Sequence, residues 1–152
     1  MTKIGLITCA NATQDLNCAS IGCLKAINTR GAYFSAYLEH EALELTGIIS
    51  CAGCPTLNAP EKILKRVKSL MEFNVDVIHF SFCMKHGCPF IKKYEKVIRE
   101  VYPDVRIVQG SHADPPEAVE GFKANMKELL APTQCVPQDM NDHIKKRVKL
   151  SG

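Results

Sequence analysis

Two cysteines three positions apart, Cys51 and Cys54 in the segment CAGC, lie between an apolar run and a helix-like segment. Two thiolates at this spacing can share one tetrahedral metal ion or bind an iron–sulfur cluster, and the same spacing occurs in dithiols that cycle between thiol and disulfide. The motif alone leaves three readings open: half of a metal site, a redox dithiol, or two small core residues.

A second pair follows in the segment FCMKHGCPF, where four residues separate Cys83 from Cys88. Pro89 predicts that Cys88 lies at or near a helix N-cap, where the helix dipole favours the thiolate over the thiol. The two pairs together give CxxC followed by CxxxxC. We interpret this combination as a metal-binding pattern whose first candidate ligands are Cys51, Cys54, Cys83 and Cys88.

The elements that position these cysteines are predicted from alternating strand and helix patterns. Apolar segments rich in Ile, Val and Phe predict strands over residues 3–8, 43–50, 75–82 and 105–110. Helical periodicity lies between them, over 20–38 with an interruption at Gly31, from Glu61, from Pro89 and from Pro115. This alternation predicts an α/β three-layer sandwich with a mostly parallel sheet of four or five strands, flavodoxin-like or Rossmann-like.

Two of the predicted helices carry start signals. Asn58 with Glu61 resembles a capping box, and Pro60 suits a first helical turn. Asp114 is a predicted N-cap for the last helix.

Ligands of open parallel sheets bind outside the carboxyl ends of the strands. Here those ends carry cysteines or, after the fourth strand, a histidine, and the connections that follow carry further cysteines. We therefore predict one metal-binding rim with eight candidate ligands, enough for two four-coordinate centres: Cys51, Cys54, Cys83, Cys88, Cys9, Cys18, Cys23 and His112. Zinc accepts mixed Cys and His ligation, whereas an iron–sulfur cluster prefers thiolates, so the metal is not resolved.

The alternative to ligation is that each cysteine is a small buried residue, which is common for free thiols. Their placement in strand-to-helix connections, rather than along helix faces, favours chemistry. Cys135, in a Pro-flanked tail, is the exception and is left out.

The remaining histidines are weaker candidates. His86 shares the loop of the second cysteine pair, and His79 lies inside a predicted strand, where we expect a hydrogen-bonded core histidine. His40 and His143 have polar neighbours and are expected to be solvated.

Composition is that of a globular protein with one core. The 152 residues are 46% apolar and 23% charged, with a net charge of +3, which predicts one domain over residues 1–131 and a C-terminal tail over 132–152. The mild charge gives no indication of a nucleic acid or membrane partner, and a basic cluster at residues 145–149 is interpreted as solvated. No glycine-rich phosphate loop and no GxSxG nucleophile motif occurs.

The N-terminal apolar stretch is too short for a secretory signal, so we expect a cytoplasmic protein. The cytosol keeps thiols reduced, and eight cysteines in that compartment favour metal ligation or redox catalysis over structural disulfides.

Several of these segments occur in an order that resembles a known family: KIGLITC, CASIGCLKAI, TGIISCAGCP, SFCMKHGCPF and GSH. The chain is similar over residues 3–112 to the CGGC domain family, named for a central Cys-Gly-Gly-Cys after the second strand, and departs from that name at Ala52. The resemblance implies a metal-binding domain, zinc being suggested by the family's cysteines and histidines, and it names no reaction.

Two functions stay open on the sequence. The first is a cytoplasmic metal-binding protein with an iron–sulfur cluster or zinc and a redox or metal-handling role, or with an ion that only pins loops together. The alternative is a metal-free thiol-disulfide oxidoreductase in which Cys51 attacks and Cys54 resolves the mixed disulfide. A protein redox partner is compatible with either, and the sequence indicates neither a substrate nor an oligomeric state.

Overall fold

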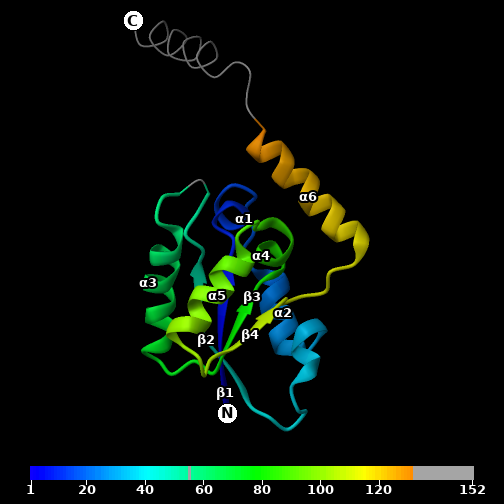
Figure 1. Cartoon of the computed structure of the whole chain (residues 1–152). Coiled ribbons are helices and arrows are strands. Elements are labelled where there is room, and N and C mark those ends of the chain that lie inside the picture. Colours follow the sequence, from blue (N-terminus) through cyan, green and yellow to red (C-terminus); the bar gives the residue numbers. More distant parts are fainter. Residues whose placement is uncertain (55, 132–152) are drawn as a thin grey trace, which may run out of the picture.

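The computed structural model describes residues 1–54 and 56–131. Cys135, His143 and the basic cluster at 145–149, each assessed from the sequence, lie outside the described residues. Four strands form one parallel sheet (Figure 1). In chain order they are β1 (Thr2–Thr8), β2 (Leu43–Ser50), β3 (Val77–Phe80) and β4 (Arg106–Gln109).

The strand order in the sheet is β2-β1-β3-β4, so β1 lies in the middle with β2 and β3 on its two sides. The central strands are the most buried, with Ile4 to Thr8 of β1 and every residue of β3 inaccessible or nearly so. Continuous apolar runs of this kind are typical of strands covered on both faces. The predicted parallel sheet is confirmed, although the third strand is shorter than predicted because residue 82 already begins a helix.

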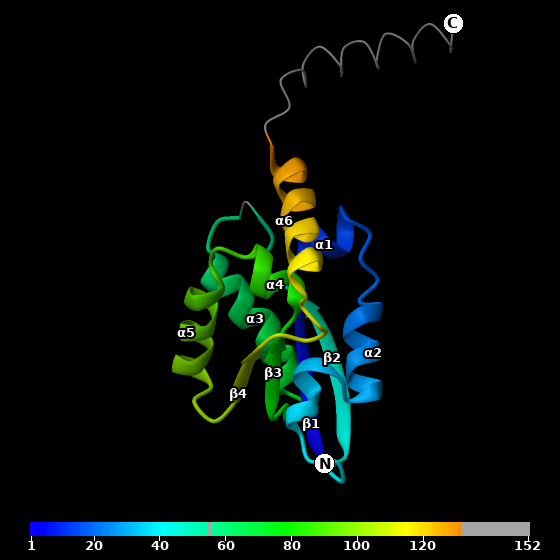
Figure 2. The same ribbon diagram turned by 90° about the vertical axis from the view of Figure 1, so that its right-hand side faces the viewer.

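Helices cover both faces of the sheet (Figure 2). On one face lie α3 (Ala59–Met71) and α5 (Ile91–Val101), whose Ile63, Val67 and Ile98 share a buried cluster with β1 and β3. On the other face lie α2 (Ile21–Thr29) and the 3-10 helix η1 (Ala32–Ala36), which pack on Ile4 and Leu6. The predicted three-layer α/β sandwich is therefore confirmed.

Three further helices lie at the carboxyl end of the sheet (Figure 1). They are α1 (Ala10–Gln14), α4 (Phe82–Gly87) and α6 (Pro116–Leu130). The first two were not predicted, because five or six residues are too few to show a helical period. The long helix α6 packs on α4, has Met126 as its buried residue, and projects beyond the carboxyl end of the sheet rather than covering a face (Figure 2).

Three predictions about helix ends are wrong. Asn58 precedes α3 in a left-handed conformation and makes no side-chain cap, so the Asn58–Glu61 capping box does not form, although Pro60 does occupy the first turn. Pro115 rather than Asp114 is the N-cap of α6. Cys88 ends α4 instead of starting α5, which begins after Phe90.

The stretch over 20–38 divides where the sequence placed an interruption. α2 ends at a left-handed Arg30, and η1 begins after Gly31. Within residues 1–54 and 56–131, none of the helices combines the length and apolarity that crossing a bilayer requires.

Candidate thiol site at the carboxyl end of the sheet

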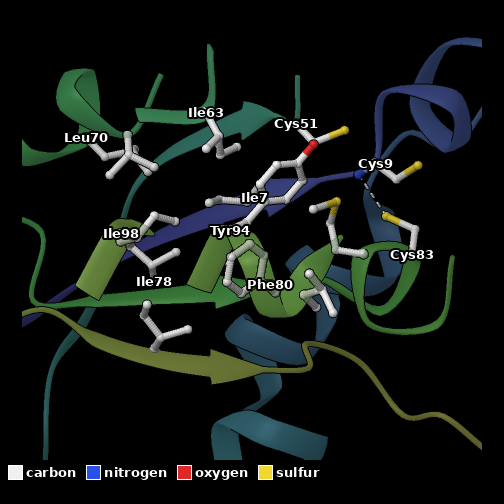
Figure 3. Packing of buried hydrophobic residues seen from close by; sticks show 14 of the residues in the cluster. Ile7, Cys9, Cys51, Ile63, Leu70, Ile78, Phe80, Cys83, Tyr94 and Ile98 are labelled. Atoms are coloured by element: carbon white, nitrogen blue, oxygen red, sulfur yellow. Dashed lines mark hydrogen bonds between the residues drawn. The ribbon is translucent and has the colours of Figure 1, made fainter. Parts of the chain in front are cut away.

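The ends of three adjacent strands bring three cysteines together. Cys9 follows β1, Cys51 follows β2, and Cys83 lies in the first turn of α4 after β3. Because the strand order is β2-β1-β3, the three residues form a row with Cys9 in the middle (Figure 3). The Cys9 N–H donates to the Cys83 sulfur at 3.2 Å, and all three residues are buried. The topology, rather than spacing along the chain, therefore gathers these thiols.

Of the three thiols in this row, Cys51 is the one whose pKa is lowered. The Cys9 thiol donates a hydrogen bond to the Cys51 sulfur, backbone N–H groups of Ala10 (3.4 Å) and Gly53 donate as well, and the Arg66 charge adds to them. Together they outweigh burial and lower the pKa of Cys51 to about 6. The pKa of Cys9 is raised instead, because its proton is held in the bond to Cys51 and because it is buried.

Four of the eight candidate ligands line one cavity of about 670 Å³, here called the thiol cavity: Cys9, Cys51, Cys54 and Cys88. Burial and the nearby negative charge of Cys51 raise the pKa of Cys54. Burial raises the pKa of Cys88 to about 11. The predicted Cys88 thiolate at a helix N-cap is thus wrong, because the residue closes α4 and is shielded from water.

The other four candidates line a separate cavity of about 430 Å³, here called the second pocket: Cys18, Cys23, Cys83 and His112. Its thiols are held by hydroxyl groups, with the Cys23 sulfur 3.1 Å from Ser111 Oγ and the Cys83 sulfur 3.0 Å from Ser81 Oγ. The His112 ring stacks on Phe82 with 4.6 Å between ring centres. The single rim predicted from the sequence is therefore two neighbouring pockets.

The donor chemistry fits a thiolate-bound metal, since the thiol cavity is lined by four cysteines and all four are free thiols. The side chains are not gathered around one point. In the described part of the chain, no three Cys, His, Asp or Glu side chains stand where they could hold one metal ion. The ligand set therefore stays a prediction.

In the loop between Cys51 and Cys54, the residue with a left-handed backbone conformation is a glycine. Gly53 has φ of +93°, a left-handed value that disfavours residues with a side chain, whereas Ala52 has no such conformation. Ala52 therefore fits the loop without strain.

Two histidines have structural partners. His79 is fully buried, with its ring nitrogens 2.7 Å from the Tyr37 hydroxyl and 2.8 Å from the Gly110 carbonyl, which confirms the expected core histidine. His86 is 2.9 Å from the Asp114 carboxylate rather than at a thiol.

Asp114 contacts three side chains from other segments. The sequence did not indicate this role, because the residue was interpreted as a helix cap. Its carboxylate accepts hydrogen bonds from Lys85 at 2.7 Å and Tyr33 at 2.8 Å as well as contacting His86, and these partners hold its pKa well below the usual range. The hydroxyls of Ser81 and Ser111 were also missed, since a lone serine carries no distinctive signal.

The fold and the site define a class: a three-layer α/β domain with cysteines at the carboxyl ends of its parallel strands. The chain belongs to the CGGC domain family, whose family model matches residues 3–112. It is 26% identical over 118 residues to an uncharacterized protein of Methanocaldococcus jannaschii, an alignment that covers 72% of this chain and 86% of that protein. No solved structure matches the chain.

Proposed function

We propose that the chain is a cytoplasmic metal-binding protein that holds a zinc ion or an iron–sulfur cluster at the carboxyl end of its sheet. The observation that carries the proposal is that four free thiols line one cavity, three from the connections that follow β1 and β2 and one from the end of α4. Cysteine sulfur is the donor that zinc and iron–sulfur centres share. Membership of the CGGC domain family supports the same function.

The four thiols would contribute unequally. The contacts of Cys51 lower its pKa and favour the thiolate, whereas burial raises the pKa of Cys54 and of Cys88, which must each lose a proton to bind a metal. Binding by these residues therefore releases protons and strengthens as pH rises. The second pocket offers three cysteines and one histidine, a donor set that also occurs in zinc sites.

Anaerobic purification followed by visible absorption, metal analysis and acid-labile sulfide analysis tests the proposal. Iron with sulfide and a brown colour identifies a cluster, and colourless protein with stoichiometric zinc identifies a zinc site. Cys54→Ser and Cys88→Ser are expected to lose the metal of the thiol cavity, while Cys18→Ser, a matched change in the second pocket, retains it. Full-length protein that binds neither metal refutes the proposal.

A second candidate is a thiol-disulfide oxidoreductase, favoured by the contacts that make Cys51 a thiolate beside Cys54. The Cys51 thiolate would attack one sulfur of an external disulfide, whose S–S bond breaks to release one thiolate. Cys54 would then attack the mixed disulfide and release the second, so that two external thiols form as the protein dithiol is oxidised. Metal-free protein in which Cys54→Ser traps a mixed disulfide on Cys51, and Cys88→Ser does not, supports this function.

A further inference from the structure

The thiol cavity is much larger than a metal ion needs. A tetrahedral ion with sulfur ligands at about 2.3 Å occupies a small part of it. Its volume of about 670 Å³ is that of a pocket for an organic molecule, since such pockets hold roughly 300 to 1,000 Å³. Its wall is mostly apolar and comes from α3, α4, α5, α6 and the loop before α3, with the large side chains Leu57, Met84, Phe90, Tyr94, Met126 and Leu130.

Tyr94 presents an unpaired hydroxyl inside this cavity. The residue is 1% exposed, and its hydroxyl points toward Cys51 (Figure 3). Within the described residues the hydroxyl makes no hydrogen bond, and its oxygen is not among the side-chain atoms that are sealed off without a partner, so it is accessible from the cavity. This donor is therefore available to a bound molecule.

The rim of the cavity carries one basic side chain. Lys93, an exposed residue in the first turn of α5, is the only Lys, Arg, Asp or Glu among the described residues that line the cavity. An acidic group on a bound molecule would therefore meet a cation at the rim.

We propose that the thiol cavity binds a small aromatic carboxylic acid with a neutral oxygen at its far end. The ring lies among Met84, Phe90 and Met126, the neutral oxygen accepts the Tyr94 hydrogen bond, and the carboxylate pairs with Lys93. Aromatic rings pack well on thioether and aromatic side chains, which form much of this wall. This inference goes beyond the proposed function and holds whether or not the thiols bind a metal.

Methionine methyl NMR of the full chain tests the inference, because Met84 and Met126 line the cavity while Met1 and Met71 do not. The probe is 6-hydroxy-2-naphthoate, added to reduced protein labelled with ¹³C at the methionine methyls. We expect saturable shifts of the Met84 and Met126 signals and unmoved Met1 and Met71 signals.

Two substitutions on α5 probe the polar contacts. Loss of one net hydrogen bond predicts that Tyr94→Phe and Lys93→Gln each weaken probe binding by about 3- to 10-fold. Lys92→Gln is the matched control, since Lys92 lies beside Lys93 in sequence but does not line the cavity, and its affinity is expected to be that of the wild type.

Three results overturn the inference: no saturable shift of Met84 and Met126, equal shifts of Met71, or equal losses in Lys93→Gln and Lys92→Gln. Metal content is measured on the same samples. Metal-bearing protein that ignores the probe refutes this inference alone, and metal-free protein that binds the probe refutes the metal proposal alone.

Discussion

The contact with the Cys9 thiol is the largest of the causes that lower the pKa of Cys51, and Cys9→Ala tests its contribution. The substitution removes the largest of the contacts that lower the pKa of Cys51 and leaves the backbone donors of Ala10 and Gly53. The pKa of Cys51 is therefore expected to rise from about 6 toward the 9.0 of an ordinary cysteine.

The size of the effect depends on what is measured. At pH 7 a thiol of pKa 6 is about nine-tenths ionised, and a full shift to 9.0 would leave about one-hundredth. A thiolate of higher pKa is also more nucleophilic, by about 20-fold for such a shift. The alkylation rate at pH 7 would then fall by only about 4-fold. The titration midpoint is the sharper observable, because nucleophilicity does not move it.

The assay is alkylation of Cys51 by iodoacetamide in metal-free, reduced protein, followed by peptide mass spectrometry between about pH 4 and 10. The wild type is expected to show a midpoint near 6 and Cys9→Ala a clearly higher one. Cys23→Ala is the control, since it removes a buried thiol of the second pocket. An unchanged midpoint in Cys9→Ala, or a wild-type midpoint near 9.0, would refute the reasoning.

Three further predictions concern stability. Burial lowers the pKa of His79 from 6.5 to about 4, so the contribution of the neutral ring to the free energy of unfolding is complete above pH 6.5 and falls by up to about 3 kcal/mol as pH drops through 4. Urea unfolding should show this loss in the wild type and not in His79→Gln. Gly53→Ala should destabilise by about 1–2 kcal/mol in thermal unfolding because of its left-handed φ, with Ala52→Gly as the control of smaller effect. Ile63→Ala, at a fully buried site, should cost about 2–5 kcal/mol, whereas Ile21→Ala at a site 69% exposed should cost under about 0.5 kcal/mol by denaturant titration.

Much of the fold was predictable because its strands are rich in apolar residues, and the central strands β1 and β3 are buried on both faces. The runs before Cys9, Cys51 and Cys83 stand out as buried strands, and the rule for the carboxyl ends of parallel strands then places these cysteines at one edge. Their adjacency required the order β2-β1-β3, which no local pattern contains.

The site was less predictable where short helices decide the geometry. The apolar run through residue 82 concealed the start of α4, and without that helix Cys88 was assigned to the next one. Asp114 precedes a helix as a cap would, but its partners Lys85, His86 and Tyr33 come from distant segments. The eight candidate metal ligands are divided between two pockets by the packing of side chains from α4 and α6, and sequence spacing does not encode that packing.

The central position of Cys9 has a thermodynamic consequence for the two pockets. Its thiol bonds to Cys51 in one cavity, while its amide bonds to Cys83, which lines the other. If a metal cation binds in either pocket as proposed, it would change the charge at one end of the Cys51–Cys9–Cys83 chain of contacts and therefore the affinity of the other pocket for a second cation. Linkage makes the coupling equal in both directions, so filling the pockets in either order gives the same total free energy.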